Sequence, residues 1–337
     1  MDRLRWGLIG CGDISSKRVA PALRDLSNCD LVAVNRSNFD LAESFAKQFG
    51  ARRWFKEWRD LVTDPEVDAV YIATPVHLHA EQTIAAANAG KHVLCEKPMA
   101  MNVRECDAMI AACANNNVQL GVAYYRHFYP AIQFIKSVLA SGEIGTPVLA
   151  QINAFERFDP EPSNPRRWLI DAEQAGGGPM FDFGCHRIEV LLDLFGEVTN
   201  IKGLTANIVF DRNVEDTASA LIQFINGPDA VLCVTHGTSE PQDTLHIFGS
   251  SGSIHVEHLN QGNIVIRSNE GDRIESYPPH PNLHLPLMDD FTEAVLGGRE
   301  PTVNGSIGRK VAQVLEEIYH NAAYTERISR KTKEETT

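Results

Sequence analysis

Asp182 and His186 have side chains suited to proton transfer and lie four positions apart. That spacing places two side chains on one face of a helix. Histidine has an ordinary pKa of about 6.5, so it exchanges protons readily at neutral pH. We therefore expect His186 to accept the proton of a substrate hydroxyl during oxidation and to donate one during reduction. Asp182 would orient the ring or the substrate and relay the proton.

Lys97 is a third residue with suitable chemistry, since it follows the apolar run His92–Cys95, which predicts a strand. An ammonium group at that strand end would stabilise negative charge on the substrate oxygen. Each of the three also has a structural interpretation: a lone lysine is commonly a surface residue, and an Asp–His pair commonly forms a helix-end hydrogen bond. Asp182 and His186 lack a third ligand at helical spacing, so we expect no metal.

A glycine-rich loop, Gly10-Cys11-Gly12-Asp13-Ile14-Ser15, lies between a predicted strand (Arg5–Ile9) and a helical pattern. The first glycine permits a tight turn, the second lets a pyrophosphate approach the backbone, and the small Ser15 allows close helix–strand packing. The loop therefore predicts a nicotinamide dinucleotide site. Its expected contacts are Gly10, Gly12, Asp13 and Ile14.

The end of the next predicted strand (Leu31–Val34) bears on the choice of cofactor. NAD sites usually place a carboxylate there for the ribose hydroxyls, but the sequence reads Asn35-Arg36-Ser37-Asn38. Arg36 could pair with a 2′-phosphate and Ser37 could donate a hydrogen bond to it. We therefore expect cofactor contacts from Asn35, Arg36 and Ser37, and NADP in preference to NAD. If Arg36 only stacks on the adenine, both cofactors remain usable.

The elements that position these residues divide the 337-residue chain in two. Over 1–123, short strands that are apolar on both faces alternate with helical patterns, which predicts a doubly wound parallel sheet, the Rossmann arrangement. Over 124–325, helices flank a run of strand-like segments separated by turn signals, which predicts an α+β substrate-binding and oligomerisation domain. The charged residues 326–337 are expected to be a frayed tail.

Composition excludes several classes of partner. The net charge is −13, of which residues 1–123 carry about −1 and the remainder about −12. The sequence has no basic stripe, so we expect neither a nucleic-acid nor a membrane partner, and any anion site must be local. The seven cysteines are odd in number and contain no C-x-x-C pair, which is typical of a reduced, cytoplasmic protein.

Four further motifs are spread along the chain. They are A-T-P-V-H-L-H at 73–79, G-K-H-V-L-C-E-K-P at 90–98, G-E-I-G at 142–145 and G-G-G-P-M-F-D-F-G-C-H at 176–186. With the glycine-rich loop, they resemble the motifs of the Gfo/Idh/MocA oxidoreductase family. The resemblance extends from residue 5 to about residue 320.

The resemblance implies a Rossmann domain followed by an α+β domain with an open, mostly antiparallel sheet. It implies hydride transfer between a nicotinamide cofactor and a hydroxyl or ketone of a sugar, sugar derivative or cyclitol. Lys97, Asp182 and His186 match the family's catalytic lysine, aspartate and histidine, and the Lys97–Pro98 bond is expected to be cis. A homodimer or homotetramer through the open sheet is also implied.

The loops that follow the strands supply further candidate contacts. Thr74, Pro75 and His79 follow one strand and could line the ribose and pyrophosphate, although a histidine there could instead cap the loop. Glu96 and Lys97 of the E-K-P motif are expected at the cofactor too. Candidate substrate contacts are Tyr125, Arg126, Arg157 and Trp168, and the alternative for the last two is a solvated Pro-rich loop.

Three other functions fit parts of this pattern. The cofactor could serve a dihydrodiol-type oxidation, or it could stay bound through a redox-neutral sugar modification. A nicotinamide-sensing regulator on the same scaffold would be expected to lack Lys97, Asp182 and His186, and all three are present.

Overall fold

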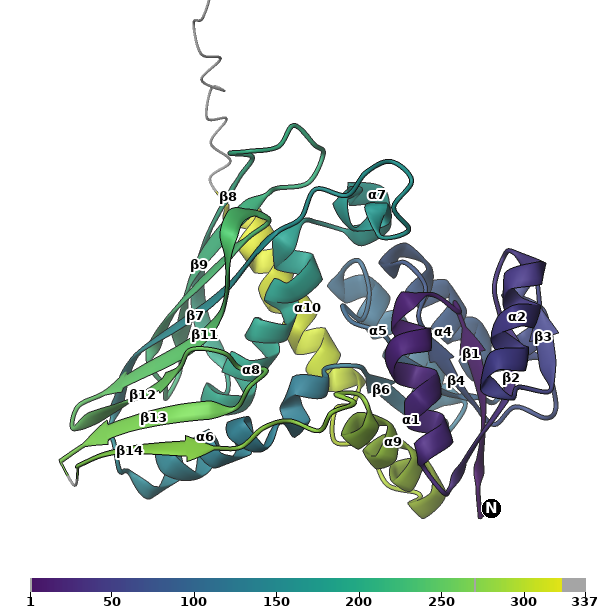
Figure 1. Cartoon of the computed structure of the whole chain (residues 1–337), viewed down its shortest axis with the longest axis horizontal. Coiled ribbons are helices and arrows are strands. Elements are labelled where there is room, and N and C mark those ends of the chain that lie inside the picture. The colour runs from purple at the N-terminus through teal and green to yellow at the C-terminus, as the bar shows by residue number, and fades with distance from the viewer. Residues whose placement is uncertain (1, 270, 323–337) are drawn as a thin grey trace, which may run out of the picture.

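Six parallel strands form the N-terminal sheet in the spatial order β3-β2-β1-β4-β5-β6 (Figure 1). The structure, a computed structural model, describes residues 2–269 and 271–322. The strands are β1 (Leu4–Ile9), β2 (Cys29–Asn35), β3 (Arg53–Phe55), β4 (Ala69–Ile72), β5 (His92–Cys95) and β6 (Leu120–Val122). The helical segments are η1 (Ser15–Val19), α1 (Ala20–Asp25), α2 (Phe39–Phe49), α3 (Trp58–Val62), η2 (Val76–Leu78), α4 (His79–Asn88) and α5 (Val103–Asn115).

The burial of the central strands explains this arrangement. Every residue of β4 is buried, because helices cover both faces of the sheet. All neighbouring strands pair in parallel, so their carboxyl ends meet at one edge. The predicted doubly wound Rossmann sheet is confirmed.

The C-terminal sheet has eight strands in the order β14-β13-β12-β11-β7-β10-β9-β8, and only the β10–β7 pair is parallel. The strands are β7 (Pro147–Arg157), β8 (Val198–Ala206), β9 (Thr217–Phe224), β10 (Asp229–Thr235), β11 (Gly237–Gly249), β12 (Gly252–Val256), β13 (Asn263–Ser268) and β14 (Gly271–Ser276). The helical segments are η3 (Tyr125–Phe128), α6 (Pro130–Ser141), η4 (Arg167–Ile170), α7 (Ala172–Ala175), η5 (Met180–Gly184), α8 (Cys185–Phe195), α9 (Leu285–Gly297) and α10 (Gly305–His320). The predicted α+β domain with a mostly antiparallel sheet is confirmed.

Helices α8 and α10 lie on one face of this sheet, between it and the N-terminal domain, and α6 lies beside the strands β13 and β14 (Figure 1). Among the described residues no helix covers the other face. The sheet is therefore open on one side, as the family resemblance implied.

Helix α9 departs from the division of the chain at residue 123. Its Leu287, Met288 and Phe291 are buried in the core of the N-terminal domain, where Phe291 lies 5.4 Å from the ring of Trp6. The chain therefore returns to the first domain after the second sheet is complete. The sequence does not predict this partner, because the apolar face of a helix does not specify which sheet it covers.

No helix in the described ranges is long and apolar enough to cross a membrane. The cysteines are free thiols, as expected, and all but Cys233 are buried. The predicted frayed tail, 326–337, lies outside the described residues.

Candidate active site

The glycine-rich loop joins β1 to the helix formed by η1 and α1. Gly10 has a φ of +87°, and a Cβ there would lie 2.7 Å from the carbonyl oxygen of Ala73, so only glycine fits. A Cβ on Gly12 would meet nothing within 4 Å. Ser15 is buried, and its hydroxyl donates to the carbonyl of Gly10 at 2.8 Å. The loop thus has a fixed turn and open space before a helix start, which fits the pyrophosphate of a dinucleotide.

The segment after β2 lies against this loop. Arg36 is half-buried, and its guanidinium donates to the Cys11 carbonyl at 2.9 Å. Ser37 is exposed, and no carboxylate occurs between Asn35 and Asn38. Asn35 is buried, and its amide donates to the carbonyls of Phe55 and Lys56, so this side chain joins β2 to the segment after β3.

The turn after β4 is held by its own side chains. The Thr74 hydroxyl donates to Gln82 at 2.7 Å. His79 is buried, and its ring nitrogens lie 2.8 Å from the Thr74 carbonyl and 3.0 Å from the Pro98 carbonyl. The His79 ring therefore joins the turn to the segment that follows Lys97.

Lys97 is positioned through Glu96. One Glu96 oxygen accepts from the Tyr71 hydroxyl at 2.7 Å and faces His284, and the other accepts from the Lys97 backbone N–H at 3.1 Å. Burial alone would raise the pKa of Glu96, but His284, Lys97 and Tyr71 outweigh it and lower the pKa to about 2. Glu96 is therefore a buried anion that anchors the end of β5. The Lys97–Pro98 bond is cis, as predicted.

The triple glycine lets the chain approach a buried carboxylate closely. A Cβ on Gly178 would lie 2.0 Å from the Glu215 carbonyl oxygen. The Glu215 carboxylate accepts from the backbone N–H groups of Gly178 and Met180 and from the Tyr319 hydroxyl. These contacts fix the start of η5, a π-helical turn that presents Asp182. Turns of this kind recur at functional sites.

Lys97 and Asp182 meet across the two domains. The Lys97 ammonium donates to the Asp182 backbone carbonyl at 2.6 Å and lies 3.5 Å from one carboxylate oxygen. Burial opposes a positive charge on Lys97, but Cys185, Asp182 and Glu96 outweigh it and raise the pKa of Lys97. Lys97 is therefore an ammonium at neutral pH. Burial likewise opposes charge on Asp182, but His236, Lys97 and Arg166 hold its pKa well below its usual range.

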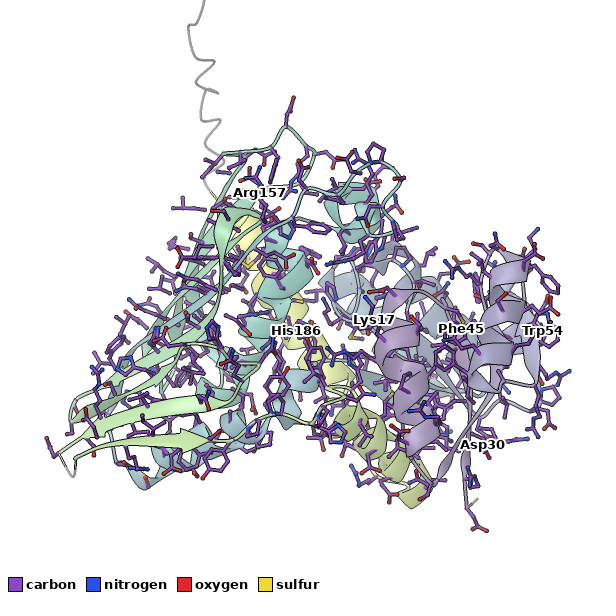
Figure 2. All side chains as sticks on the ribbon, viewed as in Figure 1. Lys17, Asp30, Phe45, Trp54, Arg157 and His186 are labelled. Atoms are coloured by element: carbon purple, nitrogen blue, oxygen red, sulfur yellow. The ribbon has the colours of Figure 1, made fainter. Side chains whose placement is uncertain are left out.

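His186 lies in the first turn of α8, between the two domains (Figure 2). It is buried, and its ring packs edge-on against Tyr125 at 4.7 Å between ring centroids. Burial, followed by the charges of Lys97, Arg126 and Arg187, places the pKa of His186 well below its ordinary value. His186 is therefore neutral at physiological pH, the form that accepts a proton.

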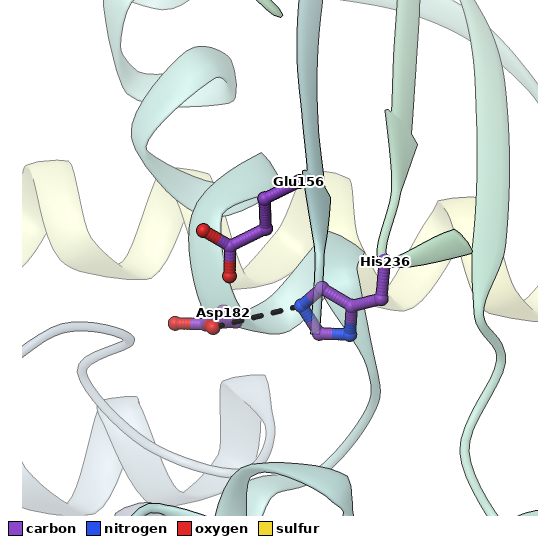
Figure 3. Close-up of side chains that lie close together, drawn as sticks. All are labelled: Glu156, Asp182 and His236. Carbon is purple, nitrogen blue, oxygen red and sulfur yellow. Dashed lines mark ion pairs between the residues drawn. The ribbon is translucent and has the colours of Figure 1, made fainter. Parts of the chain in front are cut away.

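Asp182 has a different histidine neighbour from the one its spacing suggested. The Nε2 atom of His236 lies 3.7 Å from an Asp182 carboxylate oxygen, and Glu156 completes the cluster (Figure 3). The ligand atoms of the three lie within 4.8 Å of one another, the donor set of a metal site.

Hydrogen bonding at the far side of the His236 ring argues against a metal. The Arg212 guanidinium lies 2.9 Å from His236 Nδ1. Because a guanidinium only donates, Nδ1 must be the acceptor and Nε2 must carry the proton. Nε2 then points a hydrogen at Asp182 and has no lone pair for a metal. The cluster is consistent with an electrostatic contact of 3.7 Å between His236 and Asp182 that orients the Asp182 carboxylate.

One cavity of about 300 Å³ brings the three catalytic candidates together. It also includes the predicted substrate residues Tyr125 and Arg126. The lining residues are Lys97, Tyr125, Arg126, Ala154, Phe155, Glu156, Arg166, Asp182, Phe183, His186, Arg187, Gln242, Asp243 and Asn260.

Two predicted substrate residues do not line this cavity. Arg157 is exposed, stacks over Phe210 and lies well away from His186 (Figure 2). Trp168 lines a separate hollow of about 450 Å³ with Arg212. Arg157 is the last residue of β7 and Trp168 lies in η4, so closeness in the chain to the lining residues Glu156 and Arg166 does not place them in the cavity.

Sequence reasoning did not identify Glu156, Arg187, His236 and Asp243 as site residues. Three of them come from the C-terminal strands or the turn between β10 and β11, where the strand pattern gives no sign of which residues face the cavity. Arg187 directly follows His186 and could have been considered on that ground.

The fold and the cavity define a two-domain oxidoreductase with a nicotinamide-binding domain, and comparison with known proteins gives the family. Residues 4–124 match the oxidoreductase family with an NAD-binding Rossmann fold, and residues 132–255 match the GFO/IDH/MocA C-terminal domain. The chain belongs to the GFO/IDH/MocA oxidoreductase family, a nicotinamide-dependent family of dehydrogenases and reductases.

Similar proteins cover nearly the whole chain. The oxidoreductase P35 of Formosa agariphila is 33% identical over 279 residues, which are 82% of this chain and 85% of that protein. Myo-inositol 2-dehydrogenase of Thermotoga maritima is 26% identical over 317 residues, 91% of this chain and 92% of that protein. A structure of levoglucosan dehydrogenase with NADH and levoglucosan superposes with a TM-score of 0.86 at 25% identity, covering 95% of this chain and 97% of that one.

The electrostatic environment of His186 predicts an imidazole that stays neutral under mildly acidic conditions. Because burial and three nearby cations disfavour the imidazolium, we expect no titration of His186 at or above its ordinary midpoint of about pH 6.5. Histidine-selective NMR as a function of pH measures this, with the signal assigned by its loss in His186→Asn. A midpoint of pH 6.5 or higher would contradict the prediction.

Proposed function

We propose that this chain transfers a hydride between a nicotinamide cofactor and a hydroxyl or ketone of a sugar, sugar derivative or cyclitol. The observation that carries the proposal is the shared cavity: Lys97 from the first domain meets Asp182 and His186 from the second around one space. The glycine-rich loop and Lys97 lie on the same edge of the parallel sheet, where such folds bind their ligands.

The protonation states of these residues suit alcohol oxidation. The bound cofactor supplies the hydride acceptor for the carbon. Neutral His186 accepts the hydroxyl proton, and the Lys97 ammonium stabilises the negative charge that develops on the oxygen. Asp182 holds Lys97 in place and is itself oriented by His236. In reduction the proton moves back from His186 to the oxygen.

The relatives support a sugar-like substrate. The levoglucosan dehydrogenase structure holds NADH with levoglucosan, and a further relative acts on myo-inositol. These ligands present neighbouring hydroxyl groups on a ring of monosaccharide size. A cavity of about 300 Å³ lined by charged and polar side chains suits such a molecule.

Replacing either of the two reacting side chains should lower turnover strongly. We expect Lys97→Ala and His186→Asn each to lower kcat by about 100-fold or more, because each stabilises only the transferring charge or proton. Nicotinamide absorbance over a panel of sugars and cyclitols measures this. Lys47→Ala and His320→Asn change exposed residues and serve as matched controls. Unchanged kcat in the two site variants would refute the catalytic assignment.

We further propose NADP(H) as the preferred cofactor. The support is the half-buried Arg36 beside the glycine loop, next to the exposed Ser37, with no carboxylate between Asn35 and Asn38 to repel a 2′-phosphate. An arginine binds a phosphate through paired, charge-assisted hydrogen bonds.

Arg36→Ala should therefore weaken NADPH binding selectively. We expect the Kd for NADPH to rise about 10-fold or more, since a charge-assisted hydrogen bond contributes about 1.5–3 kcal/mol, while the Kd for NADH stays nearly constant. Calorimetric titration of both cofactors into the wild type, Arg36→Ala and the surface control Arg24→Ala tests this. Tighter binding of NADH than of NADPH by the wild type would overturn the proposed preference.

The open face of the C-terminal sheet supports self-association. Leu204, Leu221 and Ile274 are more than half exposed, and Leu221 lies opposite Val231 on the same face. Exposed apolar side chains on an uncovered sheet face are typical of interfaces, so we propose a homodimer or homotetramer through this face. The free thiols support a cytoplasmic location.

A charge placed on this face should disrupt the assembly. We expect Leu221→Lys to lower the mass in solution to that of one chain, because burying an unpaired ammonium at an interface is unfavourable. Light scattering coupled to size exclusion measures the mass. Leu41→Lys, at an exposed leucine of α2, is the matched control. A wild type with the mass of a single chain would contradict the proposal.

A further inference from the structure

Arg126 and Arg187 share a single carboxylate where they line the catalytic cavity. An Arg126 nitrogen lies 3.5 Å from one oxygen of Asp243, and Arg187 donates to the other. Both arginine side chains are more than nine-tenths buried, with 5% and 6% of their area exposed. Two positive charges therefore meet one negative charge in surroundings that water reaches poorly.

The pair also has unused hydrogen-bond donors. The Nε atoms of Arg126 and Arg187 are buried without a hydrogen-bond partner. A guanidinium donates through five N–H groups and accepts through none, so the missing partner must be an acceptor. Burying a charged donor without one is unfavourable. Burial, followed by repulsion from Arg126, also lowers the pKa of Arg187.

The whole cavity has an excess of positive charge. Four cationic side chains line it against three carboxylates. Burial and the neighbouring Asp182 raise the pKa of Glu156, one of those carboxylates, which weakens its negative contribution. This local excess stands out in a chain whose net charge is −13. A ligand with one negative charge would balance it.

We propose, building on the function proposed above, that the substrate is a sugar acid whose carboxylate is bound jointly by Arg126 and Arg187. Planar guanidinium groups match the two oxygens of a carboxylate. A single negative charge fits the excess better than a phosphate ester, which carries about −1.5 to −2.

The distance to the reacting groups suits one sugar-sized molecule. The Tyr125 ring lies 4.7 Å from the His186 ring, and the Arg126 guanidinium carbon lies 5.9 Å from the same Tyr125 ring. Arg187 follows His186 directly on α8. A carboxylate at the arginine pair therefore leaves a hydroxyl of the same molecule within reach of His186 and Lys97.

The test compares acids with neutral sugars of the same configuration. D-glucuronate and D-galacturonate are titrated calorimetrically against D-glucose and D-galactose into the full chain saturated with NADPH, or with NADH if that binds more tightly. We expect at least one acid to bind about 10- to 100-fold more tightly than its neutral partner, as a charge-assisted pair implies. Equal binding, or tighter binding of glucose 6-phosphate than of every acid, would overturn the proposal.

Variants separate binding from a purely structural role of the pair. Arg187→Gln should remove the preference for the acid, whereas Arg309→Gln, which changes a partly exposed arginine outside the cavity, should retain it. Asp243→Asn removes the competing carboxylate and should tighten acid binding several-fold. If the arginines only hold α8 against β11, Asp243→Asn would lower thermal stability and leave the affinity for the acid unchanged or weaker. That result would refute the proposal, and it can be obtained even if Arg187→Gln does not fold.

Turnover with the same compounds distinguishes this inference from the proposed function. Oxidation of neutral sugars with no preference for acids would refute the sugar-acid assignment and leave the dehydrogenase function intact. No binding and no turnover of either class, nor of any other compound in the panel of sugars and cyclitols, would refute both.

Discussion

The hydrogen bond from the Lys97 ammonium to the Asp182 backbone carbonyl is the contact on which the rest of the site depends. It joins the end of β5 in one domain to the π-helical turn in the other, so the catalytic cavity exists only when both domains are folded and docked. The Asp182 carboxylate faces Lys97 with one oxygen, at 3.5 Å, and faces His236 and Arg166 with the other. Asp182 therefore contacts Lys97 through both its backbone carbonyl and its side chain.

Two buried carboxylates fix the positions of the two residues that make this contact. Glu96 fixes the strand end before Lys97, and Glu215 fixes the turn before Asp182. A buried charge is tolerated only when several donors satisfy it, and each of these carboxylates has contacts from at least three donors. The E-K-P motif therefore positions Lys97, and the triple-glycine motif positions Asp182 opposite it. Glycine is needed at Gly178 because the Glu215 backbone leaves no space for a Cβ.

The sequence predicted the elements with strong periodicity and the site residues in contiguous motifs. The strand His92–Cys95 has the predicted bounds, because it is a short apolar run with three of its four residues buried. The short β3 and α3 were missed, since three to five residues give too little periodicity. Lys97, Asp182 and His186 were found together, whereas His236 and Asp243 were not, because only the pairing of distant strands brings them to the cavity. The sequence suggested His186 as the histidine beside Asp182, because residues four apart share one face of a helix. The structure places His236 there, a contact between distant segments that helical spacing cannot predict.

The positive charges of the arginine pair also act on the proton acceptor, His186. Arg126 and Arg187, with Lys97, are the charges that add to burial in lowering the pKa of His186. An anion bound at the arginines would offset part of that field and raise the pKa of His186. The imidazole would then become a stronger base when a charged substrate occupies the cavity, and it would remain neutral when the cavity holds only water. Charge on the substrate would thus contribute to proton transfer as well as to affinity, which gives a chemical reason for placing two buried arginines beside a neutral histidine.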